Sequence, residues 1–479
     1  MTTEGPRGVE ADGIEAVRQV EQVDPELLLR LSRPGPRYTS YPTAPMWNDS
    51  VTAQTVVQRL QAAEASGAQS PLSLYFHIPF CEQMCRYCGC NVVLARQHHR
   101  ADRYIDYLAR EMDLVCAHLP RRRRVVQLHL GGGTPTFLDE RQLSRLWSEI
   151  TDRFQIDPRA EVALEVDPVV TSIQQLELLR GLGFNRVSMG VQDFTPEVQQ
   201  YVGRVQPVEL TSALYEGARR LGYQGINFDL IYGLPMQRPE TFAATLDQVL
   251  QMAPDRVAVF SYAHVPWMRP HQRAFDEALL PTPLEKFRLF TLALRRFVEA
   301  GYVQIGMDHF SRPDDELARA RLQRRLQRNF QGYTVLPASD ILAFGITGIS
   351  EIQGCYAQNL KPLARYYRTL ESGRLPIERG RVLTDDDRLR REVIHGIMCN
   401  FFVDLERVCA AHGLDAGSTF ATELSDVELL QRQNLVRRDG LQLRLTPLGR
   451  VLVRNVAMVF DPYLRTPQKP GGQTFSNTI

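Results

Sequence analysis

The sequence lacks an excess of charge of either sign. Its 479 residues include 56 Lys plus Arg and 55 Asp plus Glu, and the formal net charge is +1 at pH 7. Proteins that bind nucleic acid or an anionic membrane surface usually carry a basic excess. We therefore expect no nucleic acid and no membrane among the partners of this protein.

Long apolar runs are also missing. No stretch approaches the roughly 20 apolar residues that a membrane-spanning helix needs. The first residues, MTTEGPRGVEADGIEAVRQVEQVDPE (1–26), contain no apolar signal core and are polar enough to be loose. These features favour a cytoplasmic protein, which we expect to be a monomer.

Cysteine is scarce, with eight residues in the whole chain, yet four of the eight lie in HIPFCEQMCRYCGCN (77–91). Because thiols stay reduced in the cytoplasm, the spacing C-x3-C-x2-C of Cys81, Cys85 and Cys88 indicates a metal or cluster site before a disulfide. Zinc usually takes four ligands in a closed site, and no second cysteine pair follows. Three thiolates are enough to hold a [4Fe–4S] cluster with one open iron. Reactive or structural thiols without a metal are the remaining alternative.

Six short β-branched or apolar runs alternate with amphipathic stretches in the first half of the chain. They are residues 72–78, 125–130, 162–166, 186–191, 226–233 and 256–263. Strands that alternate with helices predict a parallel sheet with right-handed crossovers. Six such units predict an α/β fold, an open partial (β/α)6 TIM-like barrel, followed by a mostly helical C-terminal domain.

The length of the chain predicts more than one domain. Residues 1–55 should form an N-terminal tail and arm, because RPGPRYTSYPTAP (33–45) contains too much proline for a helix. Residues 56–345 should form the barrel. Residues 346–479 should form the mostly helical, winged-helix-like domain.

The predicted strand ends carry polar or glycine-rich segments. In parallel α/β folds the functional site lies at the C-terminal ends of the strands. The first strand leads into the cysteine loop and the second into GGGTPT (131–136). The other four end at Glu165 and Asp167, at Gln192, near Asp229, and at Ala263 and His264. Any single strand end meets a polar turn, but six together predict a site on one face.

Three cysteines after a first strand, with a glycine-rich loop after the second, resemble the radical S-adenosylmethionine superfamily. The resemblance implies that the open iron of a [4Fe–4S] cluster chelates the methionine part of S-adenosyl-L-methionine. Reduction would then cleave this cofactor to methionine and a 5′-deoxyadenosyl radical. Such a radical takes a hydrogen atom from an unactivated C–H bond in a site that positions it and excludes water.

Further blocks, from about residue 35 to the C-terminus, resemble the oxygen-independent coproporphyrinogen III oxidase family. They are GPRYTSYPTA, YFHIPFC, CGCN, HLGGGTPTFL, EVDP, RVSMGVQDF, FDLIYGLP, YAHVP, GMDHF, RPDDELA, RNFQGYT and CYAQN. This resemblance implies oxidative decarboxylation of two propionate groups of coproporphyrinogen III to vinyl groups, giving protoporphyrinogen IX in anaerobic haem biosynthesis. A separate electron donor would reduce the cluster.

Two other functions remain open. A haem chaperone of the same superfamily would share the barrel, but CGCN, RYTSYPTA and the matching C-terminal region argue against it. A metal-dependent regulator would use residues 400–460 to bind DNA, but the nearly neutral charge argues against that.

The resemblance also implies roles for individual residues. Cys81, Cys85 and Cys88 match the cluster ligands, and two S-adenosyl-L-methionine molecules are expected per chain. The cofactor contacts that it implies are Tyr75, Tyr87, Gly132, Gly133, Thr134, Glu165, Gln192, Arg204, Asp229, Ala263 and Ile349. Arg204 would pair with a cofactor carboxylate, and Tyr87 would stack on adenine.

Three residues are expected to act on the substrate. Cys90 belongs to the CGC motif but is not one of the three ligands, and a fourth ligand would close the open iron, so we assign it a catalytic role near the cofactors. Arg37 and Tyr38 lie in the arm that folds over the site in this family. The substrate bears four propionates and therefore needs cations. The arginines at 319–328 are candidates, although a solvated surface accounts for most of them and for RRRR at 121–124.

Overall fold

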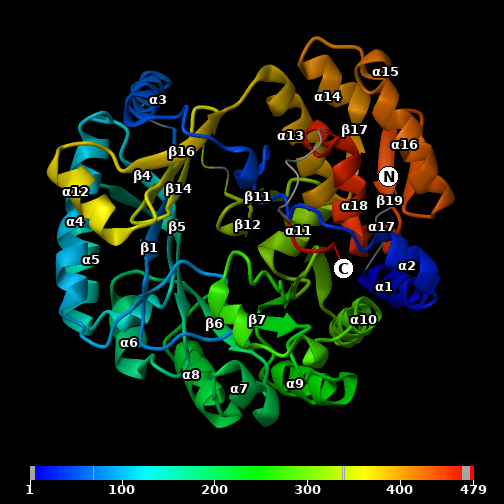
Figure 1. Ribbon diagram of the computed structural model, residues 1–479, viewed down its shortest axis with the longest axis horizontal. Coiled ribbons are helices and arrows are strands. Elements are labelled where there is room, and N and C mark those ends of the chain that lie inside the picture. Colours follow the sequence, from blue (N-terminus) through cyan, green and yellow to red (C-terminus); the bar gives the residue numbers. More distant parts are fainter. Residues whose placement is uncertain (1–5, 68–69, 337, 339, 466–474, 479) are drawn as a thin grey trace.

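The structure is a computed structural model that describes residues 6–67, 70–336, 338, 340–465 and 475–478. A 12-stranded sheet curves through its centre, in the order β16-β15-β14-β13-β1-β4-β5-β6-β7-β8-β10-β9, and helices cover its outer side (Figure 1). The neighbouring strands from β13 to β8 all run parallel. This arrangement confirms the predicted open, partial α/β barrel.

The six predicted strands form the middle of this sheet. They are β1 (Leu72–Ile78), β4 (Arg124–Gly132), β5 (Gln155–Val166), β6 (Arg186–Gln192), β7 (Gly225–Tyr232) and β8 (Arg256–Ser261). The connecting helices are α4 (Arg100–Cys116), α5 (Glu140–Thr151), α6 (Ile173–Gly181), α7 (Pro196–Val202), α8 (Val208–Arg220) and α9 (Pro239–Met252). Both α5 and α6 begin at a capping box, Asp139 with Gln142 and Ser172 with Gln175, which explains why each helix starts directly after its loop.

The sheet continues beyond the six predicted strands on both sides. Next to β1 lie β13 (Asp340–Phe344), β14 (Ile349–Ile352), β15 (Cys355–Asn359) and β16 (Ile377–Val382). Next to β8 lie β10 (His309–Ser311) and β9 (Val303–Gly306), which follow α10 (Pro283–Glu299). The predicted domain boundary at residue 345 therefore falls between two strands of one sheet.

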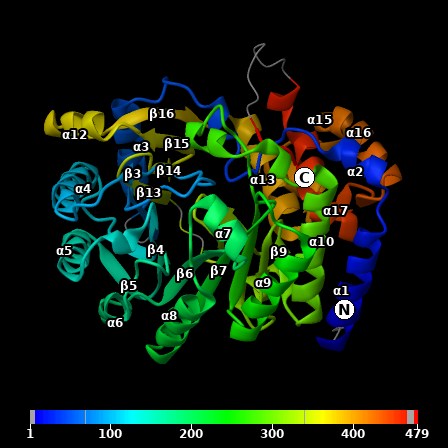
Figure 2. The same cartoon turned by 60° about the horizontal axis from the view of Figure 1, so that its bottom comes forward.

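The first described residues are helical, whereas their composition predicted a loose segment. Helix α1 (Pro6–Glu21) packs against α10 and α17 (Pro447–Val451), as Figure 2 shows. Val17 and Val20 are buried on α1, and Leu28 and Leu31 are buried on α2 (Pro25–Leu31). Tertiary contact orders these helices, because helices of 16 and 7 residues are marginal or unstable in isolation.

The arm runs between these helices and α3 (Ala53–Ala65) and is fixed by residues far along the chain. The Arg454 guanidinium donates to the carbonyl oxygens of Gly35, Pro36 (3.0 Å) and Asn477 (3.1 Å). Pro34 forms an antiparallel bridge with Asn477. The arm is therefore held on both sides by the C-terminal region.

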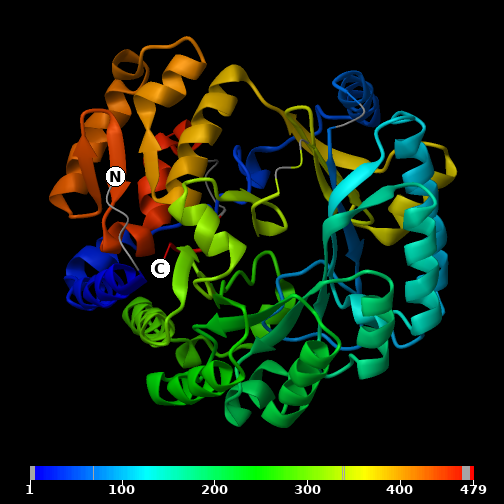
Figure 3. The same cartoon turned by 180° about the vertical axis from the view of Figure 1, so that it is seen from behind.

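The C-terminal region is mostly helical, as predicted. Figure 3 shows most of its helices gathered on one side of the molecule, opposite the helices of the barrel. They are α13 (Asp385–Asn400), α14 (Leu405–Ala411), α15 (Ala416–Thr419), α16 (Ala421–Arg432), α17 and α18 (Val453–Ala457). Helix α12 (Leu363–Glu371) lies apart from them, against the barrel helix α4. A small sheet of β17 (Phe402–Asp404), β19 (Gln442–Leu445) and β18 (Val436–Asp439) lies among them.

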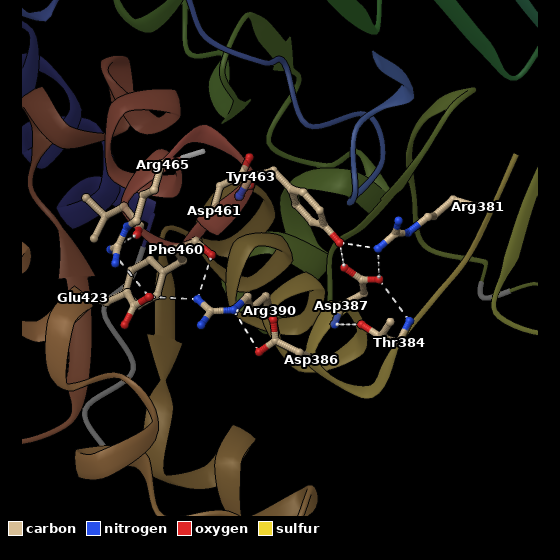
Figure 4. A network of polar contacts seen from close by, with 11 residues as sticks. Arg381, Thr384, Asp386, Asp387, Arg390, Glu423, Phe460, Asp461, Tyr463 and Arg465 are labelled. Atoms are coloured by element: carbon tan, nitrogen blue, oxygen red, sulfur yellow. Dashed lines mark hydrogen bonds and ion pairs between the residues drawn. The ribbon is translucent and has the colours of Figure 1, made fainter. Parts of the chain in front are cut away.

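A polar network joins this region to the edge of the barrel sheet (Figure 4). Arg381 on β16 pairs with Asp387 at the start of α13 (3.3 Å), and Asp387 accepts a hydrogen bond of 2.6 Å from the Tyr463 hydroxyl. Arg390, also on α13, donates to Glu423 on α16 (2.9 Å). Asp387 and Glu423 are buried, and such carboxylates need these partners because desolvation penalises an unpaired charge.

The two basic segments, RRRR at 121–124 and the arginines at 319–328, both differ from the sequence-based expectation. Arg122 of RRRR is not solvated: its side chain is fully buried and pairs with Asp340 at 2.5 Å. The predicted basic helix is short, since α11 spans only Glu316–Leu322 and a hairpin of β11 (Gln327–Asn329) and β12 (Gly332–Thr334) follows. None of the helices in the described part of the chain combines the length and hydropathy that crossing a bilayer requires.

Candidate active site

A cavity of about 750 Å³ lies inside the barrel and reaches the C-terminal ends of its strands. All of the predicted site residues line this cavity except Arg37, Tyr38, Tyr75 and Ile349. As the strand ends predicted, one cavity brings together side chains that are up to 182 positions apart in the sequence, from Cys81 to Ala263.

The cysteine loop begins at β2 (Phe80–Cys81) and is tied back through β3 (Val93–Leu94), which pairs with β2. Cys81 Sγ lies 3.5 Å from Thr134 Oγ1 on the glycine loop, and Cys85 Sγ lies 4.0 Å from Arg204 Nη1. The backbone N–H of Cys90 donates to Cys88 Sγ at 3.4 Å. All eight cysteines are free thiols, so the three predicted ligands are available to a metal group.

The pKa values of the three thiols show which of them need a positively charged metal group to become thiolates. Burial raises the pKa of Cys81 to about 11 and also raises the pKa of Cys85. Hydrogen bonding from Cys90 lowers the pKa of Cys88 to about 6, and the nearby Arg269 charge adds to this effect. A bound metal deprotonates a coordinating thiol outright, so iron would supply the positive charge that Cys81 and Cys85 lack.

The cavity offers no closed site for a single zinc ion. In the part of the chain that the structure describes, no three His, Cys, Asp or Glu side chains converge as ligands of one ion would. The ligands of a [4Fe–4S] cluster bind separate irons and are held apart by the cluster itself. Three thiols spread along one cavity wall therefore fit a cluster better than zinc.

A short segment after β8 clamps the cysteine loop from the opposite wall. The buried side chain of Gln272, on the 3-10 helix η3 (Pro270–Ala274), donates to the Tyr87 carbonyl (3.1 Å) and accepts from the Val265 N–H (2.7 Å). His271 Nε2 bonds the Cys88 carbonyl at 2.8 Å. We call His271 and Gln272 the cluster-loop clamp, because together they fix the backbone on both sides of Cys88.

The glycine loop after β4 positions Glu165. Gly132 has φ +120°, and a Cβ there would meet the His77 ring at 2.8 Å, so only glycine fits. Its N–H donates to Glu165 Oε2 (3.1 Å), and His129 Nε2 lies 3.2 Å from Glu165 Oε1. Burial would raise the pKa of Glu165, but the His129 and Gly132 hydrogen bonds hold that pKa below its ordinary value. Glu165 is therefore an ionised carboxylate facing the cavity, suited to an ammonium group or ribose hydroxyls.

Arg204 lies in the loop after α7 and is firmly held. It pairs with Asp167 (2.9 Å) and donates to the Gly190 carbonyl (2.7 Å) and to Gln206 Oε1 (3.2 Å). Burial lowers the pKa of Arg204, but Tyr87, Asp167 and Cys85 outweigh it, so the pKa is raised overall. Arg204 thus remains a cation beside the cysteine loop.

Asp229 lies on β7, across the cavity from Glu165. It accepts hydrogen bonds of 2.8 Å from Ser188 Oγ and Asn227 Nδ2. Burial, with a smaller contribution from the Glu165 charge, raises the pKa of Asp229 to about 6. The neighbouring Gln192, at the end of β6, has φ +67°, a conformation that glutamine adopts rarely and that turns the chain into the cavity.

The four predicted residues outside the cavity wall have other contacts. Tyr75 stacks on His129 behind Glu165, at 6.0 Å between ring centroids. Ile349 packs with the cluster of Trp47, Tyr356 and Leu383. Arg37 pairs with Asp308 and lies over Phe260, which does line the cavity. Tyr38 is 5% exposed and donates to Asp461 Oδ2 at 3.0 Å. The predicted ligand contacts of these four residues stay predictions.

Residues that act through other side chains were only partly predicted from the sequence: Asp167 was named as a strand end without its partner, and His129, His271 and Gln272 were not named. His129 lies in the HLGGG block and Asp167 in EVDP, but nothing in either block shows which side chain its residue partners. The clamp residues His271 and Gln272 lie in no quoted block at all. Only folding of the chain brings His129 to Glu165, Asp167 to Arg204, and the two clamp residues to the cysteine loop.

Comparison with known proteins agrees with this geometry. A family model described as "Radical SAM superfamily" matches residues 75–249, and one described as "HemN C-terminal domain" matches residues 383–452. A curated relative, the oxygen-independent coproporphyrinogen III oxidase of Escherichia coli (strain K12), is 45% identical over 96% of this chain and 100% of its own length. The relative of the same name from Synechocystis sp. is 42% identical over 95% of this chain and 97% of its own length.

A solved structure is also similar over almost the whole chain. It is the coproporphyrinogen III oxidase (HemN) of Escherichia coli, reported as a radical SAM enzyme, with a TM-score of 0.87 and 43% sequence identity. The match covers 92% of this chain and 100% of that one. It confirms the predicted fold class and the use of a [4Fe–4S] cluster and S-adenosyl-L-methionine, and it does not favour the haem chaperone or the DNA-binding regulator. The chain belongs to the oxygen-independent coproporphyrinogen III oxidase family of the radical SAM superfamily.

Proposed function

We propose that this protein converts coproporphyrinogen III to protoporphyrinogen IX without oxygen, by oxidative decarboxylation of two propionate side chains to vinyl groups. One observation carries the proposal. Three free thiols with the spacing C-x3-C-x2-C line the same cavity as Glu165, Arg204 and Asp229, in a chain that is 45% identical to the Escherichia coli enzyme over its full length.

The cysteine loop would hold the cluster through Cys81, Cys85 and Cys88. When bound and reduced, the cluster and S-adenosyl-L-methionine supply a carbon-centred radical that can remove a hydrogen atom from the β-carbon of a propionate. Glu165 is ionised and anchored by Gly132 and His129, so it is suited to bind the ammonium or ribose hydroxyls of the cofactor at the cluster.

A second cofactor site is supported by residues farther along the sheet. Gln192, Arg204 and Asp229 line the cavity beyond the glycine loop, and one cofactor at the cluster does not need all three. Arg204 presents a fixed guanidinium to a carboxylate, and Asp229 presents a hydrogen-bonded carboxyl to an ammonium or hydroxyl group. We infer two S-adenosyl-L-methionine molecules per chain.

The substrate would occupy the remainder of the cavity, beside Cys90 and under the arm. The thiol of Cys90 lies next to the cluster ligands but is not needed as one, so it is placed to act on substrate. Arg37 reaches the cavity wall through Phe260 and, with Tyr38, fixes the arm that would keep water from the radical.

The reaction requires two electron-transfer partners besides coproporphyrinogen III. A separate electron donor must reduce the cluster, and an electron acceptor must take the one electron that each propionate radical releases when it loses CO2 to form the vinyl group. We infer a monomer in the cytoplasm, where reducing conditions preserve eight free thiols and the cluster.

Anaerobic incubation with coproporphyrinogen III, S-adenosyl-L-methionine and a reductant tests the proposal. Protoporphyrinogen IX, lighter by two CO2 and four hydrogens, should form and be identified by mass. Cys81→Ala, Cys85→Ala or Cys88→Ala should lose the cluster and all product, whereas Cys90→Ser should keep the cluster signal. A cluster-loaded protein that binds haem and forms no vinyl product would contradict the proposal and favour the chaperone.

A further inference from the structure

The charges lining the cavity are almost all compensated. Four arginines line it among the described residues, and three of them form ion pairs. Arg186 pairs with Glu161 (2.8 Å), Arg204 with Asp167 (2.9 Å) and Arg256 with Asp315 (2.8 Å). Arg269 forms no ion pair with any described residue, so among these four arginines it is the one whose charge has no protein counter-ion in the described part of the chain.

Arg269 is oriented although it is not paired. Its Nη1 donates to Asn91 Oδ1 at 3.2 Å, and Asn91 directly follows Cys90 on the cysteine loop. An arginine has five N–H donors, so this one hydrogen bond leaves most of the fork free. Arg269 is thus a fixed, half-buried donor group beside the reacting end of the cavity.

Three exposed apolar side chains line the same cavity as Arg269, and we call them the apolar rim. They are Met268 (57% exposed), the residue before Arg269, together with Val169 (46% exposed) and Val205 (60% exposed). Exposed apolar side chains in a binding cavity usually offer contact area to an apolar part of the ligand. The cavity therefore combines apolar contact area with one uncompensated cation.

This combination matches one chemical class. An amphiphilic ring with an apolar face and carboxylates on its periphery would place the face against Met268, Val169 and Val205, and a carboxylate against Arg269. A propionate of the substrate and the methionyl carboxylate of the cofactor share this carboxylate chemistry. Only the substrate also brings an apolar face large enough for the rim.

We propose that Arg269 binds a propionate carboxylate of coproporphyrinogen III and so determines which anionic ring enters the cavity. The inference rests on the proposed function for the identity of the ring. It assigns a substrate contact to a residue that lies outside every block of sequence resemblance described above. Arg269 is held against Asn91 at the Cys88–Cys90 turn, so the bound propionate would lie next to the cysteine loop.

Arg269→Gln in the cluster-loaded protein tests the inference, with Arg273→Gln as the matched control. Arg273 lies on the same short helix, is exposed and does not line the cavity. Anaerobic equilibrium binding should give an Arg269→Gln dissociation constant for coproporphyrinogen III that is about 10- to 100-fold above wild type, as expected for a lost charge-assisted hydrogen bond. Arg273→Gln should bind like wild type, and Arg269→Lys should recover part of the affinity.

Two further readouts separate the alternatives. The iron content and the S-adenosyl-L-methionine dissociation constant of Arg269→Gln should equal those of wild type, and the salt dependence of coproporphyrinogen binding should weaken. Unchanged coproporphyrinogen binding, or weakened cofactor binding in its place, would overturn the inference. Because the assay needs no turnover, a wild-type protein that binds the ring through Arg269 but forms no vinyl product would contradict the proposed function and support this inference.

Discussion

Replacing Arg204 by leucine separates the structural role of this residue from its role in binding. The Arg204 side chain is 12% exposed and its partner Asp167 is 20% exposed, at 2.9 Å. In Arg204→Leu the Asp167 carboxylate keeps the Val169 N–H, at 2.9 Å, as its only hydrogen-bond donor among the described residues. The Asp167 carboxylate, which Arg204 neutralises in the wild type, thus becomes a poorly solvated charge without an ion-pair partner.

The magnitude follows from burial. Removing one partner of a fully buried ion pair costs about 3–5 kcal/mol. Since water reaches part of Asp167, we expect about 2–3 kcal/mol here, which would lower the apparent melting temperature by a few degrees. Adding Asp167→Asn removes the stranded charge, so the double variant should recover most of the lost stability.

Cofactor binding should respond differently. If Arg204 holds a cofactor carboxylate, equilibrium dialysis of the cluster-loaded protein should give two S-adenosyl-L-methionine molecules per wild-type chain. Both Arg204→Leu and the double variant should bind one, with the iron content unchanged. Binding of two molecules by the double variant would refute this reasoning, because Arg204 would then act only by compensating Asp167.

Three other perturbations have defined outcomes. Gln272→Met removes the hydrogen-bond partner of two part-buried backbone groups, at about 0.5–1.5 kcal/mol each, so a chelator should remove iron faster than from wild type or from the exposed control Gln97→Met. Deleting residues 1–30 removes Val20 and other buried side chains, each worth about 1.5–3 kcal/mol, so the melting temperature should fall measurably while the cluster remains. The pKa of Asp229 is about 6 in the folded protein and 3.8 ordinarily, so its carboxyl stabilises the fold at acid pH, and this stabilisation is lost as the pH rises through about 6. Asp229→Asn should abolish that loss, about 3 kcal/mol at 1.36 kcal/mol per pH unit, and melt above wild type at about pH 8; equal melting curves there would contradict the shift.

The central strands were predictable because each is a short β-branched or apolar run followed by an amphipathic stretch, and in β6 every second residue is buried. Predicted residues 72–78 coincide with β1, and the other five predicted strands agree within a few residues apart from the longer β5. The outer strands were not predictable in the same way. Residues 340–344 are five buried residues in a row, too few to distinguish a strand from a helical turn, and their parallel partner β1 lies more than 260 positions earlier. The helix at 6–21 was missed because its stability comes from α10 and α17, not from its own composition.

The candidate site was predictable at strand ends and not in loops. Glu165, Gln192 and Asp229 were found because the topology of a parallel sheet sends every strand end to one rim. The positions of Arg269 and the cluster-loop clamp depend on how residues 262–275 fold back across the cavity. That segment has no hydrophobic periodicity from which its fold could be predicted. Tyr38 was assigned to the substrate from its motif, whereas its hydroxyl donates to Asp461.

The contacts of Arg454 with the arm set an order of events during synthesis of the chain. Gly35 and Pro36 leave the ribosome more than 400 residues before the Arg454 guanidinium that donates to their carbonyl oxygens. Until residue 454 has emerged, these two carbonyls lack that donor, and the ordering of such a distant contact is entropically costly. The arm therefore takes its final position only after the strands of the barrel and most of the C-terminal region have been synthesised.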